Sequence, residues 1–198
     1  MRPSHQELKD LWLYSYSRGS LLEADQWLNV MDQTDLESPQ TSALVCATVV
    51  AYARPFTISQ VTGKERVVPL KGVSPPSHLS ASHEMVLKLR DKVIGHKDAT
   101  VAKGDTATPN IILVNRDATG FDIHTIIVRG MAPNIRKELK SLCSHFVAYC
   151  EAQIRPLFTR YGQEIMRHPI GVYELLVTEG PDDWIQPHKL VERSTEQS

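Results

Sequence analysis

The sequence predicts a mainly α-helical domain: an up-and-down bundle of about four long helices, with a small β-hairpin or sheet inserted before the last long helix. Three observations indicate this fold class. Apolar residues recur at three- and four-residue spacing over long stretches. Residues 41–52 are apolar on nearly every side, and two β-branched runs lie between about residues 109 and 128. With 198 residues, 41% of them hydrophobic, the chain has the size of one domain, residues 1–198, with a real core.

The first helix is expected from about Ser4 to Met31. Within it, the Arg18-Gly19-Ser20 triplet predicts a break or kink, because glycine is a poor helix former. We interpret the aromatic residues of this helix as core rather than as a platform for stacked bases, since no basic residues interleave them closely. The apolar residues that return to one side are Leu8, Leu11, Trp12, Leu21, Leu22, Trp27 and Leu28.

The second helix, residues 41–52, is expected at the centre of the bundle, because a helix that is apolar all round must be buried. It should end at Arg54-Pro55, since the residue before a proline is pushed away from helical dihedrals. Two interpretations of Arg54 stay open. It is either a phosphate-binding cation near Arg90, or an arginine that caps helical carbonyls or pairs with a carboxylate such as Asp91 or Asp98.

A polar, proline- and glycine-rich connection follows at residues 59–77, and it either lies over a site or is a solvated loop. The third helix should begin at Ser80 or Ser82. His83 on this helix is either a second titrating group or a histidine satisfied by its neighbours. The apolar periodicity of the helix is carried by Val86, Leu89, Val93 and Ile94.

The β-branched runs at residues 110–115 and 121–128 flank a turn and predict a hairpin within an insertion of about residues 109–128. Residues 171–177 are the candidate third strand. The last long helix should start near Pro133, a favoured first-turn residue, and kink or stop near Arg155 because of Pro156. The tail, about residues 181–198, becomes polar.

Arg90 and His96 carry the chemistry of the third helix. A guanidinium binds phosphate through two parallel hydrogen bonds, and an imidazole transfers protons near neutral pH. Six residues on a regular helix are separated by roughly 9 Å of rise and about 120° of rotation, so these two side chains do not share a face. Gly95 would end the helix and let His96 turn back, or a second subunit would supply the missing partner.

Arg90, the polar Asp91 and His96, followed by Lys97-Asp98 and preceded by the Ala51-Tyr-Ala-Arg-Pro-Phe56 segment, resemble the R-x(4–6)-H motif of the HEPN superfamily. The likeness covers roughly residues 40–100. HEPN proteins are small, helical and commonly dimeric, and some are metal-independent ribonucleases. The resemblance implies a homodimer that binds or cleaves RNA, with His96 as general acid or base and Arg90 stabilising charge on the phosphate. The substrate-binding residues that it implies are Arg54, Asp91, Lys92, Lys97 and Asp98.

Composition limits the other classes of function. The net charge of −1 excludes a global basic field, so any contact with RNA or a nucleotide must be local. The three cysteines lack CxxC spacing and are interpreted as buried thiols in a cytoplasmic protein. No segment has membrane-spanning length, and we expect no membrane association. No phosphate-binding loop, dinucleotide fingerprint or zinc-protease motif is present, so we expect no cofactor and no metal.

A rival interpretation is a noncatalytic helical module that binds a nucleotide or a protein. In that case Arg90 and His96 would form structural ion pairs with Asp91, Asp98 or a partner chain. The two interpretations differ in space: an enzyme requires Arg90 and His96 to converge in an open, positively charged cleft.

Overall fold

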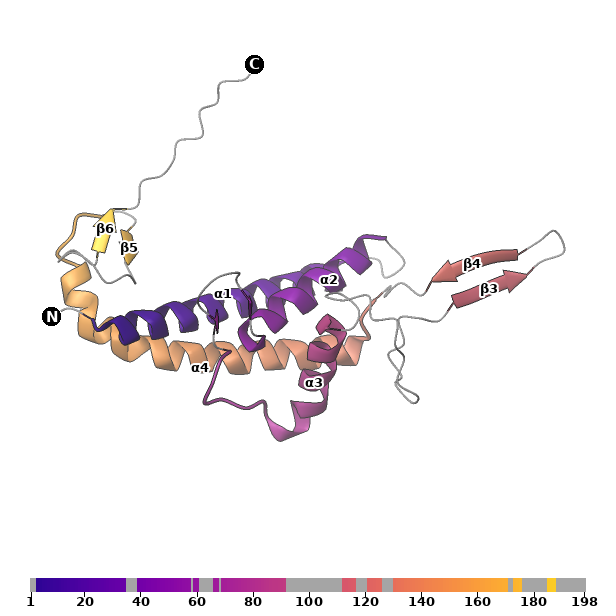
Figure 1. The fold of residues 1–198 in the computed structure, drawn as a ribbon, viewed down its shortest axis with the longest axis horizontal. Helices are drawn as coiled ribbons and strands as arrows, with labels where there is room; N and C mark the ends of the chain where they lie inside the picture. The colour runs from indigo at the N-terminus through magenta and orange to yellow at the C-terminus, as the bar shows by residue number, and fades with distance from the viewer. Residues whose placement is uncertain are drawn as a thin grey trace, which may run out of the picture. The chain divides into compact units, whose positions relative to one another are not determined.

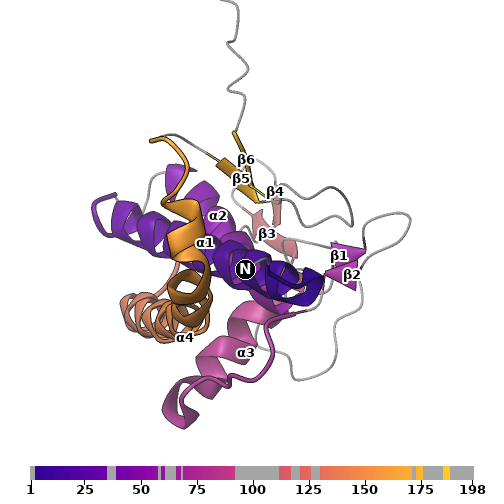
Figure 2. The same cartoon turned by 90° about the vertical axis from the view of Figure 1, so that its left-hand side faces the viewer.

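The computed structural model describes residues 3–34, 39–57, 59–60, 66–67, 69–91, 112–116, 121–125, 130–170, 173–175 and 185–187. The chain divides into two compact units, one formed by residues 1–15 and 151–198 and the other by residues 16–150. The described part is mainly helical, which confirms the predicted class (Figure 1, Figure 2). The assignment of the whole chain to a single domain stays a prediction.

Two long helices contribute residues to both units, α1 (His5–Asp32) and α4 (Pro133–Ile165). The bounds of α1 confirm the predicted first helix. The prediction that its aromatic residues belong to the core is wrong for Trp12 and Tyr16, which are 47% and 39% exposed. The predicted break at Gly19 is wrong, because α1 is helical through this residue. A glycine inside a helix costs only about 1 kcal/mol, and the buried Ser20 and Leu21 beside it offset that cost by packing.

Of the kink or stop predicted at Pro156, the stop is also wrong, since α4 continues to Ile165, and the kink stays a prediction. A proline removes one backbone hydrogen bond and crowds the preceding turn. The residues after it pack against the cluster formed by Leu8, Tyr161 and Ile185, and this burial stabilises the helix beyond the proline.

The unit of residues 16–150 contains two further helices, α2 (Pro39–Ala53) and α3 (Ser80–Leu89), and two short 3₁₀ turns, η1 (Arg54–Phe56) and η2 (Ser77–Leu79). In Figure 1, α3 lies across the direction of α4 rather than along it, so it departs from the predicted up-and-down order. The side chains of this unit's core include Leu21, Leu28, Met31, Val45, Val49, Tyr52, Val86, Leu139, Leu142 and Phe146.

Helix α2 ends next to Pro55, as predicted. The prediction that it is buried all round is wrong, because Ala43 and Cys46 are exposed while Val45 and Val49 are buried. A helix rich in Ala, Val and Thr is apolar on every side by composition, so its sequence cannot indicate which side faces the core.

The end of α1 and the start of α4 are joined by charge. Asp32 accepts hydrogen bonds from Lys140 Nζ at 2.6 Å and pairs with Arg136 Nη1 at 3.0 Å. Arg136 also donates to the Met31 carbonyl in the last turn of α1, which accepts the Thr34 backbone N–H as well. The Lys140 ammonium lowers the pKa of Asp32 against the opposing effect of burial.

The described strands form three separate antiparallel pairs. Strands β3 (Ile112–Arg116) and β4 (Phe121–Thr125) pair with Ile112 opposite Thr125, and the insertion of this hairpin into the helical domain stays a prediction. Strand β5 (Tyr173–Leu175) pairs with β6 (Ile185–Pro187), so the expectation that it adds a third strand to the hairpin is wrong. The pair β1 (Ser59–Gln60) and β2 (Arg66–Val67) was not predicted.

Among the helices that the structure describes, none combines the length and apolar character that crossing a membrane requires.

Candidate functional site

Arg90 lies at the C-terminal end of α3. Its backbone N–H donates to the carbonyls of Val86 and Leu87, and Arg90 and Asp91 continue the helix as a wider π turn. The side chain is about one third exposed, and its Nη1 atom lies 2.7 Å from Asp91 Oδ1. The predicted phosphate-binding cation is therefore accessible but has a carboxylate beside it.

The other predicted residues of this motif, Lys92, His96, Lys97 and Asp98, lie outside the described residues. The predicted convergence of His96 on Arg90 stays a prediction, as do the predicted helical positions of Val93 and Ile94.

Arg54 begins the 3₁₀ turn that follows α2, and its Nη1 atom lies 2.5 Å from Glu23 Oε2 on α1. Both side chains are about 40% exposed. Of the two interpretations of Arg54, the structure supports pairing with a carboxylate, and the carboxylate that it shows is Glu23. Asp91 pairs with Arg90, and Asp98 lies outside the described residues. Glu23 lies 31 residues from Arg54 in the sequence, beyond the reach of local reasoning.

A cluster of four rings attaches α3 to the rest of its unit, and we call it the docking cluster: Tyr52 of α2, Phe56 of η1, His83 of α3 and Phe146 of α4. The Tyr52 hydroxyl lies 2.7 Å from His83 Nδ1. The Phe56 ring meets the His83 ring edge to face at 4.8 Å between centroids, and Phe146 lies 5.6 Å from His83. His83 is thus satisfied by neighbours, one of its two predicted roles.

Burial determines the protonation states in and beside the docking cluster. Desolvation lowers the pKa of His83 against the opposing charge of Glu84, so the neutral imidazole is favoured. Desolvation also raises the pKa of Tyr52 and brings that of the neighbouring Cys143 thiol to about 12. Cys143 therefore remains a thiol at neutral pH and is a structural residue. The predicted burial is confirmed for Cys143 and Cys150 and is wrong for Cys46, which is exposed.

One further polar contact joins α3 to α4, because the Ser82 hydroxyl donates to Glu138 Oε2. Ser82 is 8% exposed. A buried hydroxyl needs a hydrogen-bond partner, so this contact specifies how α3 lies on α4.

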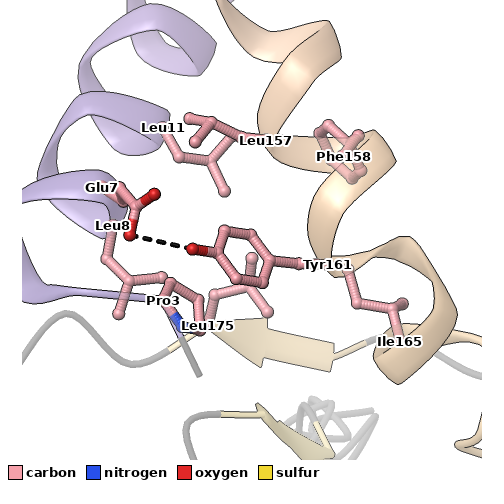
Figure 3. Close-up of a pocket in the computed structure, with 9 residues that line it drawn as sticks. All are labelled: Pro3, Glu7, Leu8, Leu11, Leu157, Phe158, Tyr161, Ile165 and Leu175. Carbon is pink, nitrogen blue, oxygen red and sulfur yellow. Dashed lines mark hydrogen bonds between the residues drawn. The ribbon is translucent and has the colours of Figure 1, made fainter. Parts of the chain in front are cut away.

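In the other unit, Glu7 accepts hydrogen bonds from four groups. The Ser4 backbone N–H and hydroxyl donate to it at 2.9 Å, and the Tyr161 hydroxyl donates at 2.8 Å (Figure 3). Arg160 also pairs with it. The Ser4 backbone contributes most to lowering the pKa of Glu7 from 4.5 to about 2, followed by Tyr161.

Glu7 borders a shallow hollow of about 270 Å³, a volume that includes open solvent. Figure 3 shows that the hollow is lined by apolar side chains of α1, α4 and β5. Because Glu7 already accepts hydrogen bonds from Ser4 and Tyr161 and pairs with Arg160, this carboxylate is interpreted as a helix cap, not as a ligand for a substrate. The remaining lining residues are Pro3, Leu8, Leu11, Leu157, Phe158, Tyr161, Ile165 and Leu175.

Within the described ranges, no group of three or more histidine, cysteine, aspartate and glutamate side chains is placed to hold a metal ion.

Comparison with known proteins identifies no relative: no family model, no curated protein and no solved structure matches this chain.

Proposed function

We propose that this protein binds RNA and cleaves it without a metal, in the manner of HEPN ribonucleases. The proposal rests on the resemblance of the segment from Arg90 to Asp98 to the HEPN motif. The observation that supports it is the position of Arg90 at the end of α3, where its partly exposed guanidinium can reach an external phosphate. Asp91 pairs with it through a solvent-exposed contact, and such contacts contribute only about 0–1 kcal/mol, so a phosphate can displace the carboxylate.

In this proposal His96 removes the proton from the ribose 2′-hydroxyl, or donates one to the leaving 5′-oxygen, and Arg90 stabilises the charge that develops on the phosphate. The phosphodiester bond breaks as the 2′-oxygen attacks phosphorus. The products are a 2′,3′-cyclic phosphate and a 5′-hydroxyl. The proposed substrate-binding set is Arg54, Asp91, Lys92, Lys97 and Asp98.

The same proposal includes a homodimer in which two Arg90–His96 motifs face one cleft, a cytoplasmic location, and the β3–β4 hairpin as an insertion of the helical domain. The exposed Ala43 and Cys46 on the apolar helix α2 support self-association, since apolar helix faces favour burial. The mass of the protein in solution, measured by light scattering, tests the dimer.

The decisive experiment incubates the full chain with a labelled RNA pool in excess EDTA and analyses the ends of the products. We expect cyclic-phosphate ends, and a loss of about 10²–10⁴-fold in rate for His96→Ala, the usual contribution of a general acid or base. The matched control is His78→Ala, because His78 is an exposed histidine just before α3.

Cleavage that is equal in the two histidine variants would reject His96 as the catalytic group. Binding without cleavage would reduce the proposal to RNA recognition. In that case Arg90→Ala should weaken binding of labelled RNA by about tenfold or more, while Arg167→Ala, which removes another exposed, ion-paired arginine beyond a helix end, should not.

The second candidate is a noncatalytic module, and the observation that favours it is that both described arginines of the motif pair with carboxylates, Arg90 with Asp91 and Arg54 with Glu23. Under this alternative, wild type and Arg90→Ala would bind RNA equally weakly. The variant would then differ from wild type only in stability, by no more than about 1 kcal/mol for an exposed pair.

A further inference from the structure

We propose that His83 is a pH-sensitive contact that holds α3, and with it Arg90, against α2 and α4, and that its protonation releases α3. The contact itself stands whether or not the chain acts on RNA. Its consequence for Arg90, which would no longer be held in a fixed position, rests on the proposed function.

Helix α3 depends on its tertiary contacts for stability. It has ten residues, and isolated helices shorter than about 12–15 residues are marginal in water. Its N-cap residue is Leu79, which provides no side-chain hydrogen bond to the first turn. The packing of α3 against its neighbours therefore supplies most of its stability.

His83 makes many of the contacts that pack α3 against its neighbours. The imidazole touches rings from three other elements: Tyr52 of α2, Phe56 of η1 and Phe146 of α4. Ser82, beside it, supplies the hydrogen bond to Glu138. Helices α2 and α4 and the turn η1 thus each meet His83, and α4 also meets its neighbour Ser82.

Tyr52 is fully buried, so its hydroxyl depends on a hydrogen-bond partner within the protein. When Nδ1 of His83 carries no proton, it accepts the hydrogen of this hydroxyl at 2.7 Å. An imidazolium donates from both nitrogens and can accept nothing. The Tyr52 hydrogen would then be left without its acceptor, because no other described residue lies at hydrogen-bond distance from it, and an unsatisfied buried donor is costly.

The influence that opposes burial and favours the imidazolium comes from the charge of Glu84 on α3. The other titratable groups near the cluster are the neutral Cys143 thiol, Glu138, which is occupied by Ser82, and His145, whose ring contacts Phe146. Burial outweighs the attraction of Glu84, and the pKa of His83 is lowered. Docked α3 therefore favours the neutral form of His83.

The docking of α3 should weaken as the pH falls. Above about pH 6.5, His83 is neutral whether α3 is docked or released, and docking is strongest. Below this pH the released form takes up a proton that the docked form resists, so docking weakens until the lowered pKa is reached. One proton is involved, so the change is up to about tenfold per pH unit.

The test needs no RNA. Histidine resonances of the full wild-type chain are titrated by NMR, with His83 assigned from the signal that disappears in His83→Asn. Hydrogen exchange of a peptide covering residues 80–91 is measured at pH 8 and pH 5.5, with rates corrected for the intrinsic effect of pH. We expect His83 to titrate below about 6.5, the ordinary pKa of histidine, and protection of the peptide to fall by up to about tenfold in wild type.

His83→Asn places an uncharged hydrogen-bonding group near the position of Nδ1, so its corrected protection should be the same at both pH values. Tyr52→Phe removes the hydroxyl but keeps the ring, and should move the pKa of His83. A wild-type His83 that titrates at or above about 6.5 would overturn the proposal. Wild-type protection that does not change with pH would also overturn it, and that measurement needs neither variant.

Discussion

Two polar contacts, one in each unit, join segments that are far apart in the sequence and do so by opposite means. Tyr52 and His83 meet inside a cluster of rings, and burial favours the uncharged imidazole. Glu7 and Tyr161 meet at a partly exposed helix start, where hydrogen bonds from Ser4 and Tyr161 favour the charged carboxylate. The comparison teaches that surroundings, more than residue type, decide which protonation state a fold selects.

The largest loss of stability is expected for Phe146→Ala. This variant removes the ring that both Phe56 and His83 contact. Phe146 is fully buried, so we expect a loss of about 3–5 kcal/mol in the free energy of unfolding, measured in urea. Phe158→Ala is the control in the other unit. Its side chain is 49% exposed, and the loss should be less than half as large. Equal losses would mean that the docking cluster is not a site of close packing.

The elements of the fold were predictable where the signal is local and repeated. Apolar spacing located α1 and the start of α4 within a few residues, and Pro55 located the end of α2. The errors at Gly19 and Pro156 share one cause: local penalties of about 1–3 kcal/mol were weighed without the packing of Leu21 or Tyr161 that outweighs them.

The contacts of the candidate site were less predictable. Tyr52 and His83 are 31 residues apart, and Ser82 and Glu138 are 56 apart, so a single sequence offers no pairing signal for them. Glu23 as the partner of Arg54 was missed for the same reason. The cap at Glu7 did have a signal: Ser4 followed three residues later by glutamate is a capping box, in which Ser4 Oγ also accepts the Glu7 N–H at 3.2 Å.

A smaller effect on stability is expected from replacing a glycine inside a helix of each unit. Gly19 in α1 and Gly162 in α4 each lie inside a helix, and a methyl group added at either position would meet nothing within 4 Å. We expect Gly19→Ala and Gly162→Ala each to stabilise the protein by about 0.5–1 kcal/mol, measured by thermal unfolding, because alanine loses less backbone freedom on folding.

Gly72→Ala is the control with the opposite sign. Gly72 has φ of +79°, and an added methyl group would lie 3.0 Å from the Tyr149 hydroxyl. We expect this variant to be destabilised. If Gly19→Ala stabilised the protein but Gly162→Ala did not, helix propensity would limit stability in one unit and not in the other.

The smallest effect at neutral pH is expected for Glu7→Gln, because contacts of a partly exposed carboxylate are screened by water. The variant is informative because the contribution of Glu7 to stability is lost over a different pH range from that of His83. Since folding lowers the pKa of Glu7 from 4.5 to about 2, its contribution is complete above about pH 4.5 and is lost as the pH falls towards 2. The contribution of His83 is lost at higher pH, from about 6.5 downwards. The stability of Glu7→Gln, measured as a function of pH, should therefore lack the lower step of the wild-type profile and keep the upper step, whereas His83→Asn should lack the upper step and keep the lower one.

Glu164→Gln, which removes another carboxylate paired with an arginine, is the control and should leave both steps in place. If Glu7→Gln and His83→Asn altered the same step, the two contacts would not select opposite charge states, and the contrast between the two units would fail.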